Sequence, residues 1–239
     1  EMCIRDRYNT AVGFAAGTAM TTGSSNTLIG GLAGDAITSG LYNVAVGKDA
    51  LSTEDAHGRN TAVGYKTLET LNAGADANNT AVGYYAGQSL TTGIQNVAIG
   101  SLAFDLANAS NENVAVGYAA LTQEVKGHRN VAVGDSTLAT QQFGTSTNSY
   151  NTAVGYHAGN DVTTGIQNTL IGGLAGDALT DADYNVAVGD VALSADTQGS
   201  KAIAIGSNAL AAQNFTTATD SHNVAIGYTE GYLLTTGVY

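Results

Sequence analysis

The sequence contains no proline and no tryptophan, only one cysteine and few positive charges. A single cysteine excludes an internal disulfide framework and a zinc site built from paired cysteines. Eight Lys and Arg stand against twenty Asp and Glu, a net charge of −12, which excludes the basic surface of a typical nucleic-acid-binding protein. No apolar run reaches about 18 residues, so we expect no membrane insertion.

Glycine, by contrast, is abundant: it occupies 31 of 239 positions, roughly twice its ordinary share. A glycine-rich chain without proline is neither collagen-like nor typical of disordered linkers. These counts indicate an ordered chain that is punctuated by glycine, and they suggest internal repetition.

A five-residue word recurs thirteen times along the chain. Its positions 1 to 5 are Asn; Thr, Val or Ile; Ala or Leu; Val or Ile; and Gly, with Ala202 as the exception at position 1. Successive words start 17 residues apart, and the interval is 19 or 21 residues only after every fourth word. A fixed interval with rare insertions indicates one structural coil per word. The words start at Asn9, Asn26, Asn43, Asn60, Asn79, Asn96, Asn113, Asn130, Asn151, Asn168, Asn185, Ala202 and Asn223.

A longer period groups the coils in fours, because Thr-Thr-Gly returns every 70 to 72 residues. We therefore divide the repeat domain, residues 9–239, into blocks 9–78, 79–150 and 151–222 and a partial block 223–239. Residues 1–8 match no repeat, and residues 1–7 look like a translated sequencing-adapter remnant of the kind found at the ends of metagenomic reading frames. We expect residues 1–8 to be a non-native leader on a chain that is a piece of a longer protein.

β-Branched residues alternate within each word, which favours a strand over a helix. Seventeen residues per coil are too few for a strand–helix–strand crossover, so the sequence predicts an all-β fold. The expected architecture is a parallel β-solenoid, or β-roll, of about thirteen 17-residue coils in four-coil blocks. We expect positions 2 and 4 to face the core and the position-1 asparagines to form a ladder. The invariant glycine at position 5 predicts a bend or a positive φ.

Position 3 points to the opposite side of the predicted strand, and it is small and nearly uniform. A solvent-facing position would vary among polar residues, so we expect this row to meet another chain. The alternative is that the row faces a narrow interior and that the solenoid is monomeric. The predicted subunit interface consists of Ala11, Leu28, Ala45, Ala62, Ala81, Ala98, Ala115, Ala132, Ala153, Leu170, Ala187, Ala204 and Ala225.

The long connections after the fourth coil of each block are the candidate recognition loops, because binding residues concentrate on loops carried by a rigid scaffold. Phe143 and Phe215 hold the same loop position, beside Gln142 and Asn214. We predict that these four residues contact a glycan or a protein. The alternative is that each phenylalanine folds back and caps a longer coil.

The repeat works against catalysis, because it places like groups in rows instead of bringing unlike groups together. The four histidines lie in four different coils, so we expect exposed turn residues, and we predict no catalytic residue, no metal ligand and no cofactor. The threonine content raises an ice-binding hypothesis, but Thr-Thr-Gly returns only once in four coils.

The words resemble the head repeats of trimeric autotransporter adhesins, the YadA-like head. That family's word is Asn-Ser-Val-Ala-Ile-Gly, followed by two residues and a small one. The corresponding words here are Asn96–Gly100 and Asn223–Gly227, both Asn-Val-Ala-Ile-Gly, and Lys201–Gly206, which is Lys-Ala-Ile-Ala-Ile-Gly. The words are also similar to the repeats of phage tail-fibre proteins. The resemblance covers residues 9–237, although the coils here are longer than the usual head repeat and carry periodic insertions.

The resemblance implies a left-handed β-roll whose chains form a homotrimer side by side. It predicts a non-enzymatic, extracellular structural and adhesive rod on a cell surface or a virion tail fibre. Such a rod would bind a cell-surface glycan or protein by multivalent weak contacts. The alternative from another functional class is a monomeric solenoid that binds ice or a repetitive polysaccharide.

Overall fold

The computed structural model describes residues 2–5 and 8–238 of the chain. Parallel strands stack as an all-β solenoid of about 13 turns spaced about 17 residues apart, which confirms the predicted fold class. The described residues form no helix, and therefore none that could cross a membrane. The chain divides into two compact units, residues 1–115 and 116–239.

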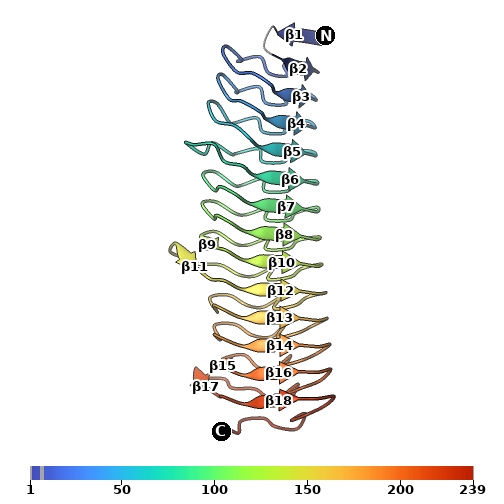
Figure 1. Cartoon of the computed structure of the whole chain (residues 1–239), viewed down its shortest axis with the longest axis vertical. Helices are drawn as coiled ribbons and strands as arrows, with labels where there is room; N and C mark the ends of the chain where they lie inside the picture. The colour runs from blue at the N-terminus through green and yellow to red at the C-terminus, as the bar shows by residue number, and fades with distance from the viewer. Residues whose placement is uncertain (1, 6–7, 239) are drawn as a thin grey trace. The chain divides into compact units, whose positions relative to one another are not determined.

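The first unit contains one short strand for each word, and these strands stack in chain order (Figure 1). Pairing keeps the words in register, so that Thr10 pairs with Thr27 and Ala11 with Leu28. Residues 2–5 of the predicted leader form a strand that pairs antiparallel with the first word strand. The strands are β1 (Met2–Arg5), β2 (Asn9–Val12), β3 (Thr27–Ile29), β4 (Val44–Val46), β5 (Thr61–Val63), β6 (Thr80–Val82) and β7 (Val97–Ile99), while β8 (Val114–Val116) lies at the boundary between the units.

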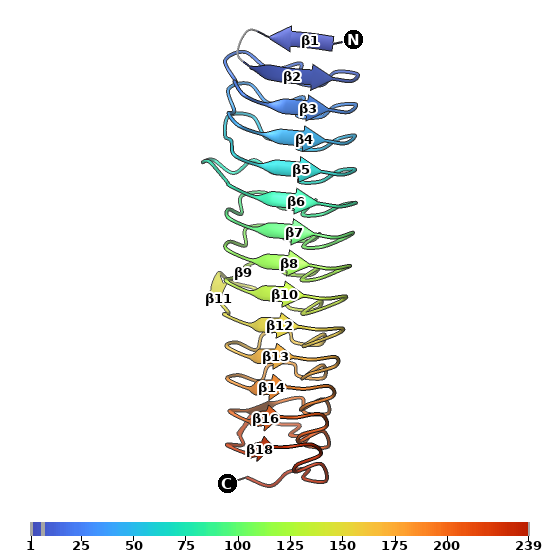
Figure 2. The same ribbon diagram turned by 45° about the vertical axis from the view of Figure 1, so that its right-hand side comes forward.

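The second unit repeats this arrangement and adds two short parallel pairs, β9 with β11 and β15 with β17. Both pairs lie where the fourth-coil connections project, away from the word strands (Figures 1 and 2). The strands are β9 (Gly127–His128), β10 (Val131–Val133), β11 (Thr147–Asn148), β12 (Thr152–Val154), β13 (Thr169–Ile171), β14 (Val186–Val188), β15 (Gly199–Ser200), β16 (Ile203–Ile205), β17 (Thr219–Asp220) and β18 (Val224–Ile226).

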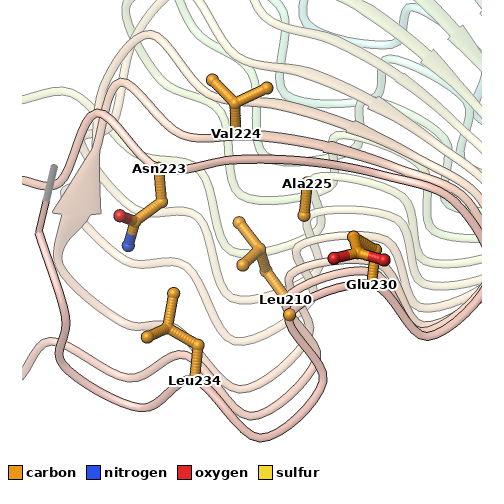
Figure 3. Close-up of a pocket in the computed structure, with 7 residues that line it drawn as sticks. Leu210, Asn223, Val224, Ala225, Glu230 and Leu234 are labelled. Atoms are coloured by element: carbon orange, nitrogen blue, oxygen red, sulfur yellow. The ribbon is translucent and has the colours of Figure 1, made fainter.

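The word strands face the opposite way to the prediction: position 3 points into the coil, and positions 2 and 4 point out. From Leu28 onward, every position-3 side chain is at most 3% exposed, whereas Ile99 at position 4 is 39% exposed. At the last word, Val224 points away from the side of the strand that carries Asn223 and Ala225 (Figure 3). The assignment of positions 2 and 4 to the core is therefore wrong.

The prediction that position 3 forms a subunit interface is wrong for the same reason, because a single chain buries the row. Ala11 in the first coil is half-buried, and the other members are all buried: Leu28, Ala45, Ala62, Ala81, Ala98, Ala115, Ala132, Ala153, Leu170, Ala187, Ala204 and Ala225.

The size of the side chain at position 3 is related to the size of a second inward residue of the same coil. Where position 3 is alanine, the residue four places after the word's glycine is often a large buried one, such as Leu51 or Leu193. Where position 3 is Leu28, the later residue is Gly34, on which a Cβ would lie 2.8 Å from the Leu28 side chain. The two positions are therefore never both large, and close packing makes alanine the fitting partner of a large residue. In the first coil of each block both are small, and a Cβ on Gly87 would lie 2.9 Å from the Leu68 side chain of the preceding coil.

The predicted asparagine ladder is present, with an interruption at Ala202, and its shorter bonds run from side chain to main chain. The Oδ1 of Asn151 accepts the backbone N–H of Asn168, and the Oδ1 of Asn168 accepts that of Asn185, both at 2.9 Å. The Nδ2 of Asn168 donates to the carbonyl oxygen of Ala182 across the coil (2.8 Å). Because these asparagines are fully buried, the ladder supplies hydrogen bonds that water cannot.

The glycine at position 5 has the predicted positive φ, which is 144° at Gly83. A Cβ on Gly83 would also collide with the carbonyl oxygen of Gly100 in the next coil. Both the backbone conformation and the close stacking of the coils therefore require glycine there.

We expect Asn168→Ala to lower the free energy of unfolding by about 2–4 kcal/mol, because it leaves the Asn185 N–H and the Ala182 carbonyl buried without their side-chain partner. Urea titration followed by circular dichroism measures the change. The control is Asn148→Ala, which changes an exposed side chain of β11 and should stay within about 0.5 kcal/mol of the wild type. Equal unfolding midpoints for the two variants would contradict a stabilising role for the ladder.

Candidate functional site

In each unit the side chains at positions 2 and 4 form a surface that we call the outward face. Position 2 carries Thr, Val or Ile, and position 4 carries Val or Ile. Parallel pairing places like positions side by side, as with Val186 and Ile203 at position 2. Ile171 and Ile205 at position 4 are 39% and 37% exposed. The face is thus a regular array of β-branched, mostly apolar side chains that solvent reaches.

The candidate recognition loops place their aromatic rings inside. Phe143 is 6% exposed and Phe215 is 7% exposed, so neither ring is available to a ligand. The prediction of recognition by the two rings is wrong, and the alternative, in which each phenylalanine folds back into the longer coil, describes the structure. Gln142 and Asn214 are exposed, and the backbone N–H of Asn214 donates to the carbonyl oxygen of Thr235 (2.8 Å).

Buried carboxylates hold these loops in place. Glu54, Glu124 and Asp196 each occupy position 12 of the third coil of a block, counted from the start of the word, and all three are fully buried. Their spacing in the sequence is regular, and the same position in most other coils carries an apolar residue such as Ile37 or Leu90. A charged residue at a position that is apolar in most other coils is the signal that the sequence offered for them; the remaining polar copies are Gln141 and Gln213, in the fourth coils.

Asp196 shows how such a carboxylate works. One carboxylate oxygen accepts the backbone N–H groups of Gly199 (3.0 Å) and Phe215 (2.9 Å), and the other accepts the Gln213 side-chain amide (2.6 Å). The Oε1 of Gln213 in turn accepts the Nδ2 of Asn223 (2.7 Å). Asp196 therefore connects the fourth-coil loop, through Gln213, to the position-1 asparagine of the next coil.

Glu124 makes the equivalent network in the second block. It accepts the backbone N–H groups of Lys126 (3.0 Å) and Gly127 and the side-chain amide of Gln141 (2.5 Å). The Oε1 of Gln141 accepts the Nδ2 of Asn151 (2.8 Å). Burial raises the pKa of Glu124, and the hydrogen bonds from Gln141 and the backbone oppose that rise. The network is structural, since the backbone N–H groups and the glutamine amide that donate to Glu124 all belong to the same chain.

A pocket of about 270 Å³ lies at the last coil, lined by Leu210, Ala225, Leu234, Asn223 and Glu230 among others (Figure 3). Ala225 belongs to the inward row, so the pocket is continuous with the solenoid interior. It offers apolar interior surface with two polar groups at its edge.

We expect Phe215→Ala to lower the free energy of unfolding by about 3–5 kcal/mol, because it removes a buried ring and leaves a cavity under the loop. Chemical denaturation measures the loss, and hydrogen exchange of residues 216–221 reports the loosened loop. Gln142→Ala, which changes an exposed side chain, is the control and should stay within about 0.5 kcal/mol. Unchanged stability of the Phe215 variant would contradict the structural role of the ring.

Comparison with known proteins adds no relative to this description: no family model, no curated protein and no solved structure matches the chain. Arguments about function therefore depend on the repeat words and on the geometry above.

Proposed function

We propose that the chain is part of a non-enzymatic, extracellular structural and adhesive fibre, on a cell surface or a virion tail, and that it assembles as a homotrimer. The outward face is the observation that carries this proposal. Contiguous exposed apolar surface of more than a few hundred Å² marks an interaction site in soluble proteins. The outward face is mostly apolar, regular and in register along the paired word strands of a unit, which suits a partner with the same repeat.

The subunit interface in this proposal consists of positions 2 and 4, and not of the position-3 row, which the chain buries within itself. A second copy of the chain presents the same side chains at the same spacing, so the rows of side chains on its outward face can pack against those of the first copy. The number three and the left-handed coil come from the resemblance to trimeric adhesin heads.

Adhesion in this proposal is a property of exposed loop residues that recur from block to block, such as Gln142 and Asn214. Their partner would be a cell-surface glycan or protein. Single contacts of this kind are weak, but a trimer with several blocks multiplies them, because linked sites raise the effective concentration of one another.

A second candidate function is a monomeric solenoid that binds ice or a repetitive polysaccharide. The observation in its favour is that position-2 threonines, among them Thr61 and Thr169, lie on the outward face with their side chains half-exposed. In this alternative the ordered ligand occupies the surface that a second chain covers in the trimer.

Light scattering after size-exclusion chromatography should give three times the chain mass of 24.1 kDa. Val82→Glu combined with Val188→Glu should yield a folded monomer, because it buries two unpaired charges in the interface. The control, Gln142→Glu combined with Thr216→Glu, adds the same charge in exposed loops and should stay trimeric. A monomeric wild type would overturn the trimer, and thermal hysteresis would then favour ice binding. A trimeric Val82/Val188 variant would place the interface elsewhere.

The trimer should bind a printed glycan array with an apparent affinity about 100-fold higher than the monomeric Val82/Val188 variant, because only the trimer engages several sites at once. Biolayer interferometry on the strongest glycan measures the ratio. Equal affinities for trimer and monomer would contradict multivalent adhesion.

A further inference from the structure

The turn after the buried carboxylate is built differently in the first block. In the second and third blocks the residue three places after the carboxylate is Gly127 or Gly199, and a Cβ on either would collide with the carboxylate group. In the first block this residue is His57. Its Nδ1 lies 3.4 Å from the Oε1 of Glu54. The first block therefore has an imidazole side chain at a position where the other two blocks have no room for a Cβ.

Glu54 also lacks the side-chain donor that its counterparts have. Leu71 replaces the glutamine that donates to Glu124 and Asp196. Each oxygen of Glu54 accepts one backbone N–H, from His57 (3.1 Å) and from Ala73 (3.3 Å). The Nδ1 of His57 is buried and makes no hydrogen bond with any of the described residues. An oxygen of a fully buried carboxylate and a buried ring nitrogen therefore lie 3.4 Å apart without a hydrogen bond between them.

Asp55 adds a third group beside this pair. Its counterparts in the other blocks, Val125 and Thr197, carry no carboxylate. One ligand atom each from Glu54, Asp55 and His57 lies within 4.8 Å of the others. Glu54 is held by its two backbone donors, whereas Asp55 is exposed and free to turn its carboxylate inward.

We propose that Glu54, Asp55 and His57 bind a zinc ion. Imidazole nitrogen and carboxylate oxygen are ordinary zinc ligands, and three protein ligands leave the fourth tetrahedral position to water. Bonds of about 2.0–2.1 Å in a tetrahedron place two ligands about 3.3–3.4 Å apart. The separation of 3.4 Å between His57 Nδ1 and Glu54 Oε1 fits that edge.

The ion would fasten the third coil to the loop that follows the fourth. Glu54 already accepts the backbone N–H of Ala73, in the connection of the first block. A zinc ion on Glu54 would therefore join the turn at residues 54–58 to that connection, in the place where the other blocks use glutamine. The positive charge would also compensate the buried carboxylate.

Calorimetric titration of the full chain with ZnCl₂ tests the site. We expect one zinc ion per chain, and a melting temperature that rises with zinc concentration because the ion binds the folded state. His57→Gly, which installs the residue of the other two blocks, should weaken binding about 100-fold or more. Asp55→Thr, the residue of the third block, should weaken it about 10-fold. His222→Ala, which removes an exposed histidine, should bind as the wild type does.

Zinc binding that is absent from the wild type, or equally tight in the His57→Gly variant, would overturn the proposal. A simple His57–Glu54 ion pair predicts another pattern: no effect of zinc, a lower melting temperature for His57→Gly, and recovery when Leu71→Gln restores the missing donor. That pattern would also overturn it. Circular dichroism of His57→Gly confirms that a loss of binding is not a loss of fold, since Gly127 and Gly199 show that the turn accommodates glycine.

Discussion

The hydrogen bond from a backbone N–H to the side-chain oxygen of the preceding asparagine is the interaction on which the rest of the solenoid depends. It fixes the register of neighbouring coils, because only one residue in each coil presents its N–H to that oxygen, as Asn168 does to Asn151. It also fixes which way each strand faces. Since side chains alternate along a strand, an inward asparagine at position 1 places position 3 inside and positions 2 and 4 outside.

The coil period, the strand at each word and the glycine bend could be predicted from the sequence, because each depends on local spacing and local conformation. The direction in which the strands face could not be predicted from hydrophobicity, since both sides of the strand carry apolar residues. The informative signals were of another kind. Position 3 shares its side of the strand with a buried asparagine, and it is large only where a later residue is glycine, as Leu28 with Gly34 shows. Both patterns describe a narrow interior.

The candidate loops were located by the sequence and misread in their chemistry. An aromatic residue in a polar connection suggests an exposed contact, yet Asp196 accepts the backbone N–H of Phe215 and draws that segment inward. The ring then fills the space that the longer coil encloses. Sequence alone could not show this, because the carboxylate and the phenylalanine are 19 residues apart and meet only when the coils stack. The outward face was missed for the complementary reason: it was assigned to the core.

In a repeat protein, the residues that equivalent positions share from block to block indicate what the fold requires. Two blocks place glycine beside the buried carboxylate and glutamine against it, so those residues satisfy the fold. The first block departs at both positions and gains Asp55 at a third. A buried charge with fewer partners is costly, so a fully buried Glu54 without a side-chain donor needs compensation that the other blocks do not need. A cation held jointly with His57 removes that cost, which is why the departures from the repeat, and not the repeat itself, indicate a site.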